Sequence, residues 1–136
     1  MINFNYETKF SLEDETSMAS WISGIIQKEG FKEDEINYIF CDDDYLHKIN
    51  VEFLKHDTLT DIISFDYSVG KTLQGDVFIS IERVRDNAEE FKVSFLNELH
   101  RVMVHGVLHY CGYKDKTEPD TKVMREKENF YLQLLN

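Results

Sequence analysis

The chain has 136 residues and carries 15 Lys and Arg against 26 Asp and Glu, which gives a formal net charge of −11. With 42% hydrophobic and 30% charged residues it can close a core, so a disordered chain is excluded, and the length fits a single domain over 1–136. The acidity also argues against general binding of nucleic acid, but residues 1–70 hold 5 basic and 15 acidic side chains, whereas residues 71–136 hold 10 and 11.

The first third of the chain alternates strand and helix patterns. Alternating apolar and polar residues predict a strand over 2–6. An apolar stripe at helical spacing predicts a helix over 16–29, which Gly30 ends. A second strand is expected over 36–41, and the acidic residues 42–44 suit the N-terminus of a short helix.

Two further strands are expected over 61–67 and 76–81, because both segments are rich in β-branched and aromatic residues. The turn between them is predicted to contain Gly70 and Gly75. A helix should then run from Ile81 to about residue 91.

The last third is predicted to be helical. Ser94 is a good N-cap for a long helix that runs to about Cys111 and ends at Gly112, and Thr117 is a good N-cap for the last helix. The whole order predicts an α+β class, an α/β sandwich with a small mixed four-stranded sheet and about five helices.

The sequence carries no membrane signal. No apolar run approaches the length of a membrane span, and the first ten residues lack the pattern of a signal peptide. Cys41 and Cys111 lie in apolar surroundings and are expected to be reduced. We therefore expect a cytoplasmic protein without a membrane partner.

Two histidines lie four residues apart at the end of the predicted long helix. Four residues return to the same helix face one turn on, so His105 and His109 can bind one metal ion. Gly112 lets the chain reverse, and Asp115 can then supply a third ligand. Three protein ligands leave a position open for water, which is typical of a catalytic zinc site at the end of this helix.

Histidines at this spacing also occur by chance on helices that bind nothing, and this alternative stays open for the pair alone. Gly106 stands where zinc peptidases of the two-histidine type have their general base Glu, so that class is disfavoured. Glu98 precedes His105 by seven residues, about 10 Å along the helix axis. It is too distant to be a shared ligand. We expect it to support the site from behind the ligands, to be a buried polar link to the sheet, or to be a solvated side chain.

This segment resembles the central motif of the YbeY endoribonucleases, also called rRNA maturation factors. The family motif His-Gly-x-Leu-His-x-x-Gly-Tyr-x-His is matched by His105, Gly106, Leu108, His109, Gly112 and Tyr113. The resemblance covers most of the chain from Leu46 onward. Further matches are Asn50, the run from Thr60 to Phe65, Gly75, Asp76, Glu98, Met124 and Glu128.

The resemblance implies a metal-dependent endoribonuclease that is specific for single-stranded RNA and binds one zinc ion per chain. It implies a role in 3′-end maturation of 16S rRNA and in ribosome quality control. The expected partners are therefore an rRNA precursor and the small ribosomal subunit. By position, His105 and His109 correspond to family ligands.

Three positions depart from the family pattern, one of them Leu59, where the family has a proline before its Thr-Asp pair. Asp115 stands where the family has a third histidine, and a carboxylate oxygen is an acceptable zinc ligand. Leu54 stands where the family has an Arg that is assigned to phosphate binding. Lys55, Arg101 or Lys114 is then the candidate for the phosphate contact, and the sequence does not choose among them.

The strand over 61–67 is expected to form one wall of the substrate cleft through Ser64 and Phe65. Phe65 either stacks an unpaired base or belongs to the core. Two other functions stay open: a metallohydrolase of another substrate class, metalloendopeptidases included, and a non-catalytic ribosome-associated factor whose metal stabilises the fold.

Overall fold

A computed structural model describes residues 1–54 and 60–135 of the chain. Within these ranges the strands are β1 (Ile2–Tyr6), β2 (Lys32–Cys41), β3 (Ile62–Asp66) and β4 (Thr72–Ser80). The helices are α1 (Glu15–Lys28), α2 (Asp43–Leu54), α3 (Ile81–Phe91), α4 (Phe95–Tyr110) and α5 (Glu118–Leu135). The predicted α+β class, with four strands and five helices, is confirmed over the described residues.

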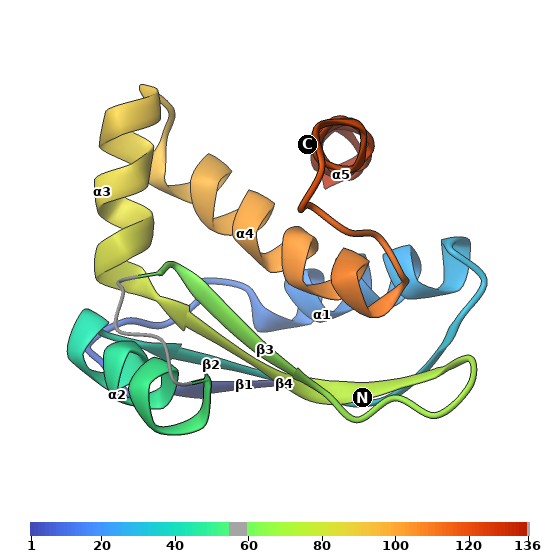
Figure 1. Cartoon of the computed structure of the whole chain (residues 1–136), viewed down its shortest axis with the longest axis horizontal. Coiled ribbons are helices and arrows are strands. Elements are labelled where there is room, and N and C mark those ends of the chain that lie inside the picture. The colour runs from blue at the N-terminus through green and yellow to red at the C-terminus, as the bar shows by residue number, and fades with distance from the viewer. Residues whose placement is uncertain (55–59, 136) are drawn as a thin grey trace.

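The four strands form one mixed sheet in the order β1-β2-β4-β3. The pairs β1-β2 and β2-β4 are parallel, whereas β3 runs antiparallel to β4 along one edge. Helices α1 and α4 lie along one side of the sheet and α2 lies beside its other side, while α3 and α5 flank α4 (Figure 1). None of the described helices is long and apolar enough to span a lipid bilayer.

The main core lies between the sheet and helices α1 and α4. Strand residues alternate between faces, so Tyr38 and Phe40 of β2 and Val77 and Ile79 of β4 point inward and are fully buried. The Tyr38 hydroxyl donates a hydrogen bond to the Met103 carbonyl at 2.8 Å, which ties the sheet to α4. The side chains that remain on the other face form a smaller cluster under α2.

Helix α4 rests closely on the sheet because two glycines make room for it. A Cβ on Gly106 would lie 3.1 Å from side-chain atoms of Ile62 and Val77. Gly75 lies inside β4 and not in the turn predicted from the sequence. A Cβ there would overlap the Tyr110 hydroxyl, which donates to the Phe65 carbonyl at 2.9 Å. This contact fixes the C-terminal end of α4 on β3 and β4.

Both ends of α4 are defined by the predicted residues. The Ser94 hydroxyl accepts a hydrogen bond from the Asn97 backbone N–H at 3.1 Å, as expected of an N-cap. Gly112 has φ +99°, a conformation that other residues rarely adopt. The chain therefore turns back sharply after α4 and passes close to the last turn of that helix.

Candidate metal centre

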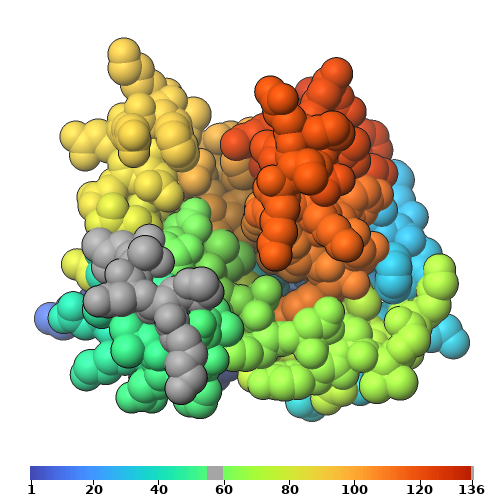
Figure 2. Space-filling view, in the orientation of Figure 1, coloured from blue at the N-terminus to red at the C-terminus, as the bar shows by residue number. Residues whose placement is uncertain are grey.

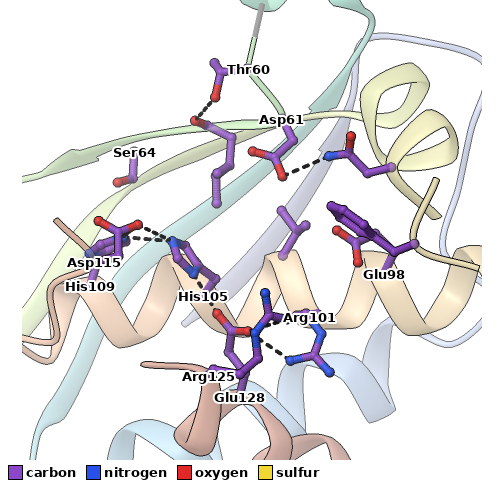
Figure 3. Close-up of a pocket in the computed structure, with 14 residues that line it drawn as sticks. Thr60, Asp61, Ser64, Glu98, Arg101, His105, His109, Asp115, Arg125 and Glu128 are labelled. Atoms are coloured by element: carbon purple, nitrogen blue, oxygen red, sulfur yellow. Dashed lines mark hydrogen bonds and ion pairs between the residues drawn. The ribbon is translucent and has the colours of Figure 1, made fainter. Parts of the chain in front are cut away.

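The three predicted ligands converge at the C-terminal end of α4. The Nε2 atoms of His105 and His109 are 2.9 Å apart. The Oδ2 atom of Asp115 lies 3.2 Å from the first and 3.4 Å from the second (Figure 3). Because Gly112 reverses the chain, Asp115 reaches the two histidines from the loop that leads to α5. These residues form a group that could hold a metal ion.

The hydrogen bonds behind the histidines decide which ring atoms face this point. The Nδ1 of His109 lies 2.9 Å from the Tyr113 carbonyl oxygen, which can only accept, so Nδ1 carries the hydrogen. The Nδ1 of His105 lies 2.7 Å from a carboxylate oxygen of Glu128, also an acceptor. Both neutral rings then present the lone pair of Nε2. As long as both rings are neutral, three acceptors meet there without a hydrogen between them, and a metal ion would satisfy that arrangement.

Glu128 of α5 is the buried support of His105. Its side chain is 5% exposed and also accepts a hydrogen bond from Arg101 at 3.0 Å. Burial raises the pKa of Glu128, but the hydrogen bonds from His105 and Arg101 outweigh burial and hold this pKa below its usual value. Burial lowers the pKa of His105, and Glu128 reverses that shift to a net rise. The carboxylate of Glu128 therefore stays ionised behind the imidazole.

Tyr113, which supports His109, is itself fixed from the far side. Its hydroxyl donates to Glu29 at the end of α1 over 2.7 Å. Glu29 also receives the Tyr131 hydroxyl and the Lys127 ammonium, the latter at 3.2 Å. Burial raises the pKa of Glu29, and these donors lower it further than burial raises it. Helices α1 and α5 thus hold the loop whose carbonyl orients His109.

The metal group opens into a cavity of about 450 Å³ that lies against α4. Figure 2 shows the surface hollowed between α3 and α5. The described residues that line the cavity include four carboxylates and two guanidiniums. The carboxylates belong to Asp61, Glu98, Asp115 and Glu128, and the guanidiniums to Arg101 and Arg125. The difference is two negative charges, which one divalent cation would balance.

Two carboxyl groups lie further along the cavity, away from the histidines. Asp61 points into it from the start of β3 and Glu98 from the first turn of α4 (Figure 3). Asp61 accepts a hydrogen bond from the Asn87 amide at 3.4 Å. Burial raises the pKa of Asp61, and burial together with the charge of Asp61 raises that of Glu98. Groups with raised pKa values in a cleft are suited to proton transfer.

Ser64 and Phe65 of β3, both predicted to line the cleft, point to opposite faces of the sheet. Ser64 lines the cavity, whereas Phe65 faces the opposite side of the sheet, as neighbours in a strand must. There the Phe65 ring packs against Phe53 and Phe78, with centroids 6.1 Å and 5.8 Å away. The prediction that Phe65 lines the cleft is therefore wrong, and its alternative as a packed core residue is the one observed.

The other predicted residues have different surroundings. Arg101 lines the cavity, but its guanidinium is held by Glu128 and by the Asn129 side-chain oxygen at 2.9 Å. Glu98 is 5% exposed and has no hydrogen bond to either histidine among the described residues. Glu128 takes the supporting position that was predicted for Glu98. Lys55 lies outside the described residues.

Several residues of the cavity were not predicted from their own pattern. Glu128 had a usable signal, because it falls on the buried stripe of α5 between Met124 and Tyr131, where a charged residue needs a partner. Arg125 and Asn87 had no signal, since charged and amide side chains on helices are usually solvated.

Three kinds of comparison with known proteins bear on the family of this chain. The model of the family described as Endoribonuclease YbeY matches residues 2–136. The Endoribonuclease YbeY of Flavobacterium johnsoniae is 64% identical over 95% of this chain and 93% of its own, and that of Flavobacterium psychrophilum is 60% identical over 100% and 97%. The solution structure of TM1509 from Thermotoga maritima superposes with a TM-score of 0.69 at 26% identity, over 99% of this chain and 89% of that one.

Proposed function

The chain belongs to the endoribonuclease YbeY family, and from this premise we propose that it is a zinc-dependent endoribonuclease that cuts single-stranded RNA. The observation that carries the proposal is the convergence of three acceptor atoms, from His105, His109 and Asp115, in a cavity of a chain of this family. Family membership supports the substrate, and the three acceptors support the metal.

Zinc fits the donor set. Two imidazole nitrogens and one carboxylate oxygen are ligands that zinc accepts, and three protein ligands leave a position for water or substrate. The oxygen of Asp115 is a harder ligand than the histidine of the family motif, so manganese or another harder ion is the natural competitor. The predicted stoichiometry is one ion per chain.

A bound ion supplies a Lewis acid for a phosphoryl oxygen and a water of lowered pKa. The side chains of the cavity have separate tasks. Both guanidiniums pair with Glu128, Arg101 at 3.0 Å and Arg125 at 3.5 Å, but the Arg125 side chain is 57% exposed and can turn toward a phosphate more easily than Arg101, which is 18% exposed. Arg125 binds the scissile phosphate and stabilises its developing charge, and the positive charge of Arg101 in the same cavity assists it. Asp61, whose pKa burial raises, holds or accepts a proton during cleavage.

The biological substrate follows from the family. We propose that the chain acts in the cytoplasm on rRNA precursors, in 3′-end maturation of 16S rRNA and in ribosome quality control, together with the small ribosomal subunit. The net charge of −11 favours delivery by such a partner over tight binding of free RNA.

The test uses the purified full chain and a single-stranded oligoribonucleotide, with the same sequence in a duplex as comparison. We expect cleavage of the single strand after zinc is added, no cleavage after chelation, and none by His109→Ala. His47→Ala on α2, away from the cavity, is the matched control and should cleave like the unmodified chain. Equal cleavage by all samples, or cleavage of an unstructured protein instead of RNA, would overturn the proposal.

A further inference from the structure

The cavity extends well beyond the metal group, and its other end contains an exposed aromatic ring. Phe91, at the end of α3, lines the cavity and is 57% exposed. Asn87 lines it too and lies one turn earlier on the same face of α3, because residues four apart share a helix face. Among the described residues, Phe91 belongs to neither apolar cluster and stacks on no other ring.

The groups beside Phe91 are polar and able to form hydrogen bonds. Asn87 uses one amide hydrogen in its bond to Asp61, and an amide offers a second hydrogen and a carbonyl oxygen besides. The Asp61 carboxylate has two acceptor oxygens. A flat apolar ring one helix turn from an amide, in a cavity where that amide is bonded to a carboxylate, matches the two recognition surfaces of a nucleobase, which are its face and its edge.

We propose that Phe91 and Asn87 form a nucleobase subsite, in which one unpaired base of the RNA stacks on the Phe91 ring and turns its edge toward Asn87 and Asp61. This inference rests on the proposed function, since it places a nucleotide next to the phosphate that is bound at the metal group. Phe91, which lines the cavity, therefore takes the base-stacking role that the sequence suggested for Phe65.

The subsite also explains a preference for single strands. A base in a duplex is paired and stacked on its neighbours, so its face cannot meet Phe91 unless the duplex opens. A base in a single strand is already accessible. The preference then comes from the shape of the cavity wall at α3 and not from the metal group.

The test combines variants of Phe91 with RNA that lacks single bases. Phe91→Ala and Phe91→Leu should weaken binding of a single-stranded oligoribonucleotide by about 5- to 100-fold, whereas Phe91→Trp should keep it. The loss should raise KM more than it lowers kcat. Leu96→Ala is the matched control, because Leu96 is a similarly exposed apolar residue, 52% exposed, that does not line the cavity.

Removal of one base at a time locates the contact. At one RNA position, removal of the base should weaken binding to the unmodified chain as much as Phe91→Ala weakens binding to the intact RNA. Removal of the same base should weaken binding to Phe91→Ala little further, because the two changes remove the same contact. Losses that add at every position, or Phe91 variants that bind and cleave like the unmodified chain, would overturn the subsite. If instead the zinc-loaded unmodified chain cuts no RNA, the proposed function fails first.

Discussion

Glu128→Gln tests whether the metal centre depends on its support from α5. The carboxylate accepts the Nδ1 hydrogen of His105 at 2.7 Å and is almost completely buried. Glutamine keeps the shape and one acceptor oxygen but loses the negative charge. A hydrogen bond to a charged acceptor is about twice as strong as one to a neutral acceptor. The imidazole of His105 then becomes a weaker base and a less well oriented ligand.

The expected magnitude follows from this geometry. Removing a partner behind a metal ligand typically lowers metal affinity about 10- to 100-fold, which is about 1.4–2.7 kcal/mol. Because glutamine still accepts from His105, we expect Glu128→Gln near the lower end of this range. Glu128→Ala should reach the upper end, since it also leaves the half-buried guanidinium of Arg101 without its carboxylate.

Competition with a chromophoric chelator measures the dissociation constant of zinc for each variant. Glu126→Gln is the matched control, because it is the same substitution two residues earlier on the exposed side of α5. Its affinity for zinc should equal that of the unmodified chain. Unchanged zinc affinity of Glu128→Gln in a folded protein would show that Glu128 does not support the metal centre.

Three further predictions concern the surroundings of the site. Glu29→Gln should lower the free energy of unfolding at pH 7 by about 1.5–3 kcal/mol. Since the net shift of the Glu29 pKa is downward, this stability difference should be present above the pKa of an unfolded Glu, about 4.3, and should shrink as the pH falls through the folded pKa. Urea unfolding at pH 7 and pH 3 measures the difference. A difference that is as large at pH 3 as at pH 7 contradicts the role assigned to Glu29. Gly75→Ala should destabilise the chain by about 3 kcal/mol, because the new Cβ meets a backbone carbonyl and the Tyr110 hydroxyl. Gly24→Ala, in open space on α1, should instead stabilise the chain by about 0.5–1 kcal/mol. Thermal unfolding of both variants measures these effects, and equal effects would argue against close packing of α4 on the sheet. Arg125→Ala should raise KM for single-stranded RNA about 10-fold and weaken zinc binding less than Arg101→Ala does, because the hydrogen bond of Arg101 to Glu128 is 3.0 Å long and the exposed Arg125 lies 3.5 Å from the same oxygen. Steady-state kinetics beside the chelator assay would disprove this division if the two variants behaved alike.

The elements with strong local signals were predictable from the sequence. Ser94 and Gly112 mark the ends of α4 because capping and left-handed backbone depend on the residue itself. The convergence of His105, His109 and Asp115 was predictable for the same reason, since helical spacing and a reversing turn bring these three residues together.

What the sequence did not reveal depends on contacts between distant segments. Gly75 reads as a turn residue, but its position is explained by Tyr110, which is 35 positions away along the chain. The outward direction of Phe65 depends on the register of β3 against β4, which the alternation pattern alone does not set. The first residues of β2, from Lys32, are mostly exposed and polar, so the strand is longer than its apolar part.

The cavity itself was beyond sequence reasoning. Asn87 and Phe91 of α3 meet Asp61 and the residues of α4 only because the helices fold over the edge strand. Local patterns indicate what each side chain can do, but they do not indicate which side chains share a cavity.

The most direct test of the account is a titration of the metal-free chain with zinc, in which the cleavage rate of a single-stranded oligoribonucleotide is followed against ions added per chain. We expect a linear rise that levels off at one ion per chain, and no rise for the double variant His105→Ala, His109→Ala. Full cleavage by the metal-free chain, or the same plateau for the double variant, would contradict it.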